Sequence, residues 1–214
     1  MIKNDIHIIR IPTSDLSASR ILFSELDLKP FYSNESILCD WYCIHRYIFC
    51  IIQNEDQHPS LVIYVNDMQS ALDRLDKFGI ICDFTINEAG EFFEASFFDP
   101  AGIELRLAEL TDAPQIPDFD NSQIEFTIPS SADFKDSVNF WHLLEFEVNA
   151  SEAKKHPWVT YSKSRFKLGI HQHYNWTLPG LYVSAKSKQM AFFKKLESLN
   201  LDQLRVKFYL SDTF

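Results

Sequence analysis

The stretch that most constrains this chain runs from Phe97 to Leu105 (FFDPAGIEL), where aromatic residues lead into an Asp-Pro-x-Gly turn and an apolar segment follows. In such a turn the aspartate accepts hydrogen bonds from the next backbone amides, proline presets φ, and Gly102 supplies a conformation that a Cβ would oppose. The stretch therefore predicts a β-hairpin. Such hairpins occur in many folds, so the preceding segments decide the fold class.

A strand and a helix are predicted upstream of the hairpin. Residues 61–67 (LVIYVND) are β-branched and aromatic and end in polar residues, which is typical of a strand that leads into a turn. From Met68 to Gly79 apolar residues recur every three or four positions, which is helical spacing, and Gly79 lies where a helix C-cap is expected. The predicted order is strand, helix and then further strands.

This order resembles the βαβββ module of the vicinal oxygen chelate superfamily, which includes glyoxalase I, bleomycin-resistance proteins and extradiol dioxygenases. The matching residues are Tyr64–Asp67 (YVND), the helix ending in Phe78–Gly79, and Phe98–Gly102 (FDPAG). Upstream, a strand, a helix starting near Ser14 or Asp15 and three further strands are predicted before residue 54. Residues 1–110 are thus predicted to hold two modules. The resemblance implies an α+β fold, with the modules paired into a cupped eight-stranded sheet and helices on its outer face.

Motifs of the first 110 residues recur after the segment 111–121, whose prolines and acidic residues favour a linker. The sequence IPTS at 11–14 returns as IPSS at 128–131, and Tyr64 and Val65 return as Tyr182 and Val183, 118 residues later. This near-constant offset predicts a tandem duplication, with a second glyoxalase-like domain at 122–214. The same offset ends the second copy before an equivalent of the hairpin, so we expect a truncated second domain without its closing strand.

Superfamily enzymes hold a divalent metal with His, Gln or Glu side chains from the first and last strands of paired modules. The resemblance places these positions in the first copy at Ile6 or Ile8, Ile52, Ser60 and Arg106. Glu104 is expected on the same face of the strand as Arg106. It could serve as the last-strand ligand only if it were displaced along the strand. His7 has the opposite parity to Ile6 and Ile8 and is expected to face away from the cup. We therefore favour no metal in the first copy.

The second copy offers other candidate ligands. Its first strand presents Gln123 and Glu125 on one face, and its fourth strand ends in HQHYNW at 171–176, where His171 and His173 share a face. His171 stands three residues before Tyr-Asn-Trp, the spacing of a metal-binding glutamate in bacterial glyoxalase I. These candidates leave the ligand set incomplete. The alternative interpretation is a lyase, isomerase or dioxygenase that uses Glu125 and His171 with Zn, Ni, Mn or Fe.

Aromatic residues are concentrated on strands of the first copy. They are Trp41, Tyr42, Tyr47, Phe49, Phe92, Phe93, Phe97 and Phe98. Because strands alternate faces, part of this set must face away from the helices, where an aromatic cup suits a flat, apolar ligand. Arg106 would add a positive charge able to pair with a carboxylate or phosphate. The favoured interpretation is a metal-independent small-molecule-binding protein with Trp41, Phe97 and Arg106 as ligand contacts, and core packing of these aromatics is its alternative. Whether a reaction is catalysed stays open.

Composition limits the partners. A formal net charge of −10 over 214 residues argues against binding of nucleic acid or an anionic membrane surface. No apolar run approaches the roughly 20 residues needed to span a bilayer, so a cytoplasmic protein is expected. The four cysteines form no C-x-x-C pair and are expected to be reduced packing residues. The exposed sheet edge of a truncated second domain could support a homo-oligomer.

Overall fold

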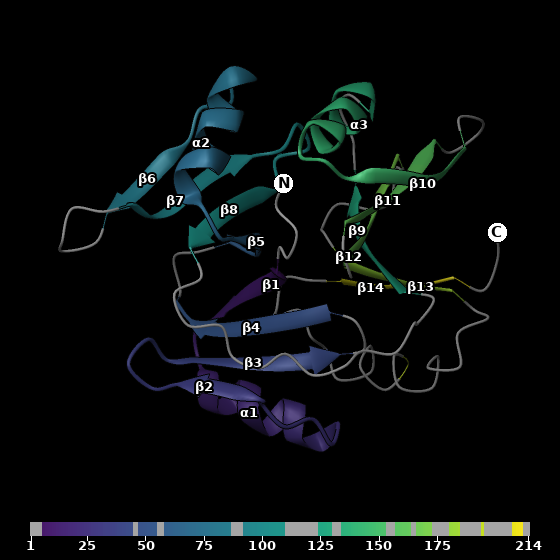
Figure 1. Cartoon of the computed structure of the whole chain (residues 1–214). Coiled ribbons are helices and arrows are strands. Elements are labelled where there is room, and N and C mark those ends of the chain that lie inside the picture. The colour runs from purple at the N-terminus through teal and green to yellow at the C-terminus, as the bar shows by residue number, and fades with distance from the viewer. Residues whose placement is uncertain are drawn as a thin grey trace.

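The computed structural model describes residues 6–44, 47–54, 58–86, 92–109, 124–129, 134–152, 157–163, 166–172, 180–184, 194 and 207–211. Within these ranges the chain forms one eight-stranded sheet and one six-stranded sheet, together with helices α1, α2 and α3 (Figure 1). None of the helices in these ranges is long and apolar enough to cross a membrane.

The first sheet has the strand order β2-β3-β4-β1-β5-β8-β7-β6. Its strands are β1 (Ile6–Thr13), β2 (Tyr32–Asn34), β3 (Cys39–Ile44), β4 (Tyr47–Gln53), β5 (Ser60–Val65), β6 (Asp83–Ile86), β7 (Phe92–Phe98) and β8 (Glu104–Glu109). Strand β1 pairs parallel with β4 and antiparallel with β5, and β5 pairs parallel with β8. The mixed eight-stranded sheet predicted from residues 1–110 is therefore present.

Local sequence signals set the ends of the first two helices. Asp15 caps α1 (Leu16–Glu25) by accepting a hydrogen bond from the Ala18 amide over 3.0 Å. Asp67 caps α2 (Met68–Lys77) in the same way through the amide of Ser70. Gly79 follows α2 with a φ of 70°, the left-handed conformation expected for a glycine at this position. Both helices pack on the same face of the first sheet.

The predicted hairpin joins β7 to β8. Asp99 accepts hydrogen bonds from the amides of Ala101, at 3.0 Å, and Ile103, at 2.8 Å. Gly102 has a φ of 83°, which a residue with a Cβ adopts only with strain. The turn chemistry predicted from the Asp-Pro-x-Gly sequence is confirmed.

The second sheet has the order β10-β11-β12-β9-β13-β14. Its elements are β9 (Ile124–Pro129), α3 (Phe134–Leu143), β10 (Glu147–Glu152), β11 (Trp158–Lys163), β12 (Phe166–His171), β13 (Gly180–Ser184) and β14 (Lys207–Ser211). Strand β14 pairs parallel with β13, as β8 does with β5. The second sheet thus has a strand at the closing position, where the constant sequence offset predicted none. The offset fails there because the chain between β13 and β14 is shorter than that between β5 and β8. The tandem duplication and its boundaries stay predictions.

Buried side chains join the two sheets. The Tyr47 hydroxyl donates to the Lys167 carbonyl over 2.8 Å and accepts from the Phe126 amide over 3.0 Å. His7 stacks on Phe166, with ring centroids 5.1 Å apart, and it contacts the edge of Phe146. His7 therefore faces away from the cup, as its parity predicts. The four cysteines are free thiols.

Candidate functional site on the cup face

The first sheet has one face covered by α1 and α2 and a second face with a separate apolar cluster. That cluster contains Ile8, Cys39, Trp41, Ile48, Cys50, Val62 and Ala108. The residues that alternate with them, including Ile9, Phe49 and Leu105, belong to the core beneath the helices. We call the face that carries Ile8, Trp41 and Val62 the cup face.

Trp41 lies at the centre of an aromatic group on the cup face. Its ring centroid is 5.0 Å from that of Tyr32, 5.9 Å from that of Tyr64 and 6.3 Å from that of Phe31. Burial raises the pKa of Tyr64 to about 12, so its hydroxyl stays protonated at neutral pH. The structure therefore puts Trp41 on the face where the sequence analysis expected it.

Phe97 lies on the opposite face from Arg106. Phe97 pairs with Leu105, whereas Arg106 pairs with Ser96, so the two side chains leave the sheet in opposite directions. Phe97 is buried in the core beneath the helices and its ring lies 6.3 Å from that of Phe140. The expectation that Phe97 lines the cup together with Arg106 is thus not met, because aromatic content does not reveal strand register.

Arg106 belongs to a network of four charged side chains on the cup face. Glu94 lies between two guanidinium groups, with one oxygen 2.8 Å from Arg10 Nη1 and the other 3.3 Å from Arg106 Nη1. Arg106 Nη2 lies 2.7 Å from a Glu104 oxygen. At most 14% of each side chain is exposed, so the charges are largely removed from water. The sequence analysis missed Arg10 and Glu94, although Arg10 has the parity of Ile6 and Ile8.

Three hydrogen-bond donors of this region are buried without a partner. They are Nε of Arg10, Nε of Arg106 and the hydroxyl of Ser60. Ser60 pairs with Arg10 on one side and with Glu104 on the other, so it lies in the middle of the network. Most buried polar groups in proteins have a partner, so unpaired donors at one place suggest a site for an acceptor.

The residues of the cup face do not fit a divalent metal. Arg106 stands at the expected closing ligand, and a guanidinium has no acceptor atom for a cation. Within the described ranges, no group of three or more His, Cys, Asp and Glu side chains could hold a metal.

The candidate ligands of the second sheet lie on the neighbouring strands β9 and β12. His171 is buried and stacks on Trp158, with ring centroids 6.3 Å apart. In the parallel pair of β12 and β9, His171 lies opposite Pro129, four residues beyond Glu125. In the first sheet Ile52 lies opposite Pro12, also four residues beyond Ile8, so the same offset separates the expected ligand positions there. The side chain of Glu125 and the residues Gln123 and His173 lie outside the part of the chain that the structure describes.

Solved structures of glyoxalases and extradiol dioxygenases resemble this chain. The Mn(II)-bound glyoxalase from Novosphingobium aromaticivorans is 10% identical, with a TM-score of 0.58 and coverage of 95% of this chain and 86% of the glyoxalase. The 2,2',3-trihydroxybiphenyl 1,2-dioxygenase from Sphingomonas wittichii is 10% identical, with a TM-score of 0.61 and 95% of each chain covered. BphC, a halotolerant catechol dioxygenase, is 13% identical, with a TM-score of 0.58 and coverage of 99% of this chain and 87% of BphC.

Comparison of the sequence with protein-family models and with curated proteins finds no match. At identities of 10% to 13% the likeness establishes the fold and not the activity. The strand order, the hairpin and the solved structures agree on one architecture. The chain has the fold of the vicinal oxygen chelate superfamily.

Proposed function

We propose that the protein binds a small molecule on the cup face and needs no metal ion to do so. The observation that carries this proposal is the set of three buried donors from Arg10, Ser60 and Arg106 that lack acceptors in the protein. A buried donor without a partner costs about 1–3 kcal/mol, and a ligand oxygen placed among these donors would offset that cost. The ligand is therefore expected to present a hydrogen-bond acceptor at this place.

The neighbouring side chains favour a flat ligand. Trp41, Tyr32 and Tyr64 form the aromatic part of the cup face, and aromatic rings stack well on planar molecules. Glu94 and Glu104 balance the charges of the two arginines, so the donors suit a carbonyl or phenol oxygen as well as a carboxylate. In this proposal Tyr64, and not Phe97, is an aromatic contact of the ligand beside Trp41.

A thermal-shift screen of planar aromatic acids, phenols and ketones, repeated with EDTA, tests this proposal. A hit should bind equally well with and without EDTA. Two variants locate it: Ser60→Ala removes one donor, and Arg106→Lys keeps the charge but removes Nε. Each should weaken a hit about tenfold, the effect of one hydrogen bond of about 1.4 kcal/mol. The exposed Ser36→Ala is the control. Compounds that bind only when metal is present, or whose affinity is unchanged in both variants, would contradict the proposal.

The alternative function is a metal-dependent lyase, isomerase or dioxygenase. Its support is the likeness to a Mn(II)-bound glyoxalase and to catechol dioxygenases. In this chain it would use His171 at the end of β12 together with Glu125. About one equivalent of Zn, Ni, Mn or Fe in the purified protein, lost on His171→Ala, would favour this alternative.

A further inference from the structure

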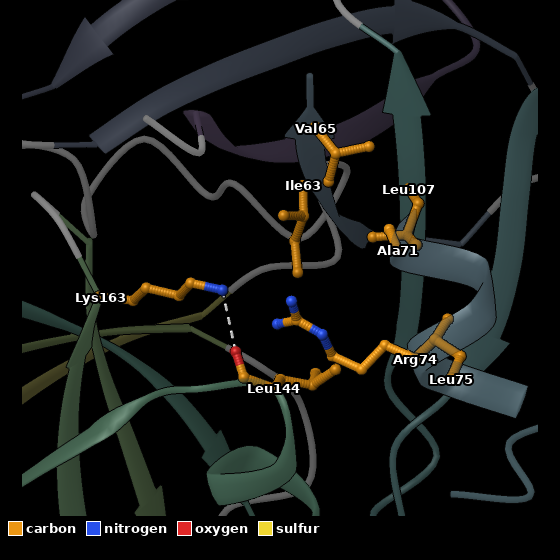
Figure 2. Close-up of a pocket in the computed structure, with 8 residues that line it drawn as sticks. All are labelled: Ile63, Val65, Ala71, Arg74, Leu75, Leu107, Leu144 and Lys163. Atoms are coloured by element: carbon orange, nitrogen blue, oxygen red, sulfur yellow. Dashed lines mark hydrogen bonds between the residues drawn. The ribbon is translucent and has the colours of Figure 1, made fainter. Parts of the chain in front are cut away.

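The geometry points to a second binding site, for a small aliphatic carboxylate, in a pocket between the two sheets (Figure 2). The pocket lies on the helix-covered side of the first sheet, where Ile63, Leu75 and Leu107 form an aliphatic wall. Leu144, directly after α3, lines it from the second sheet's side. Because it lies on the other side of the sheet from the cup face, this site is independent of the proposed function.

Two cationic side chains from different parts of the chain reach this pocket. Arg74 comes from α2 and Lys163 comes from β11 of the second sheet, and their nitrogen atoms point toward the same space in Figure 2. Only 12% of the Lys163 side chain is exposed. Two cations that converge in apolar surroundings repel one another, and the repulsion is stronger than in water. An anion placed between them would relieve this repulsion.

A carboxylate of the protein already uses part of this arrangement. One oxygen of Glu145 lies 2.6 Å from Arg74 Nη1, and its other oxygen lies 4.0 Å from Lys163 Nζ. The nearer partner of Lys163 is the Leu144 carbonyl, to which Nζ donates over 2.9 Å. Half of the Glu145 side chain is exposed, so it can move into water when another carboxylate takes its place. Glu145 therefore indicates the chemistry of the site and also competes for it.

The aliphatic side chains that line the pocket determine which group should accompany the carboxylate of the ligand. Apart from Arg74 and Lys163, the side chains around the pocket are aliphatic, and they favour an alkyl group over water. An inorganic phosphate would satisfy the cations but leave the aliphatic wall unfilled. A short fatty acid satisfies both parts, with its carboxylate between Arg74 and Lys163 and its chain against Ile63 and Leu107.

Butyrate is the probe, and isothermal titration with the full chain is the measurement. We expect binding in the millimolar range, as suits a ligand of about six heavy atoms. Butyramide has the same shape without the charge and should bind at least tenfold more weakly. Lys163→Met should weaken butyrate at least tenfold, whereas Lys77→Met on the exposed side of α2 should leave the affinity unchanged.

Glu145→Gln provides the opposite test, because it removes the competing carboxylate and should tighten butyrate binding several-fold. This variant keeps the proposal testable even if Lys163→Met does not fold. No binding of butyrate, equal binding of butyramide, or weaker binding by Glu145→Gln would each overturn the proposal. Arg106→Lys on the cup face should not alter butyrate affinity, so failure here is separate from failure of the proposed function.

Discussion

Trp141 Nε1 donates a hydrogen bond to Asp99 Oδ2 over 3.3 Å, and this bond joins the hairpin of the first sheet to helix α3. The other carboxylate oxygen of Asp99 accepts from the amides of Ala101 and Ile103. Only 4% of Asp99 is exposed. Burial raises the pKa of Asp99 to about 6, even though these hydrogen bonds act in the opposite direction. One carboxylate thus shapes the turn and links the two halves of the chain.

This pKa predicts how Asp99 contributes to stability as the pH changes. Since the pKa is higher in the folded than in the unfolded chain, the stabilising contribution is full below about pH 4 and is lost as the pH rises through about 6. We expect the free energy of unfolding of the native protein, minus that of Asp99→Asn, to fall by about 2–3 kcal/mol between pH 4 and pH 7. Urea unfolding at several pH values measures this difference. A difference that does not vary with pH would contradict the assignment.

The Tyr47 hydroxyl bridges the two sheets, so its removal should destabilise the fold. Tyr47→Phe leaves the Phe126 amide and the Lys167 carbonyl without this partner in a buried place. We expect a loss of about 2 kcal/mol in the free energy of unfolding. Tyr32→Phe is the matched control. The Tyr32 hydroxyl accepts a hydrogen bond from the partly buried side-chain amide of Asn34, two residues away on the same strand, so its removal should change stability little. Equal effects of the two variants would argue against the bridge.

Glu94 is central to the charge network on the cup face. Glu94→Gln keeps the size of the side chain but removes the charge that lies between Arg10 and Arg106. Because both arginines are largely buried, we expect the free energy of unfolding to fall by about 3 kcal/mol. Glu109→Gln, at an exposed position at the end of β8, is the control and should have little effect. Chemical denaturation of both variants measures the two free energies of unfolding. A Glu94→Gln variant as stable as the native protein would refute the role given to this network.

An ion pair between the partly exposed Arg20 and the buried Asp40 also fixes α1 to the first sheet. Arg20 Nε lies 2.6 Å from one oxygen of Asp40 and Nη2 lies 3.1 Å from the other, and Asp40 is fully buried. Burial alone would raise the pKa of Asp40, but its hydrogen bonds with Arg20 and other side chains hold the pKa below its usual value. Arg20→Met should therefore destabilise the fold, because it leaves the buried Asp40 carboxylate without its charged partner. Part of the lost stability should return in the double variant Arg20→Met with Asp40→Asn. If chemical denaturation shows that the double variant is no more stable than Arg20→Met, the pairing would be contradicted.

Features that depend on neighbouring residues could be predicted from the sequence. The hairpin follows from Asp99 and Gly102, and the start of α1 follows from Asp15, because in each case a side chain or a φ angle acts on the next few residues. The facing of His7 follows from strand alternation in the same way. The superfamily's strand order was predicted through the resemblance.

Features that depend on register between distant strands could not be predicted. Arg10 and Glu94 are 84 residues apart and meet only because β1, β5, β8 and β7 lie side by side. A shift of one residue decides whether Phe97 faces the cup or the helices, and neither composition nor motif fixes that shift. The role of β14 as the closing strand of the second sheet was missed because a constant offset cannot follow a change in the length of the preceding segment.

Elemental analysis of protein purified without chelator or metal-affinity tag tests the central claim most directly. Arg106 stands at the expected closing ligand, and Glu94 and Glu104 are engaged by arginines. We therefore expect far less than one equivalent of Mn, Fe, Ni or Zn, both as purified and after dialysis against each ion. About one equivalent of any of them, retained on gel filtration, would contradict a metal-independent binding protein.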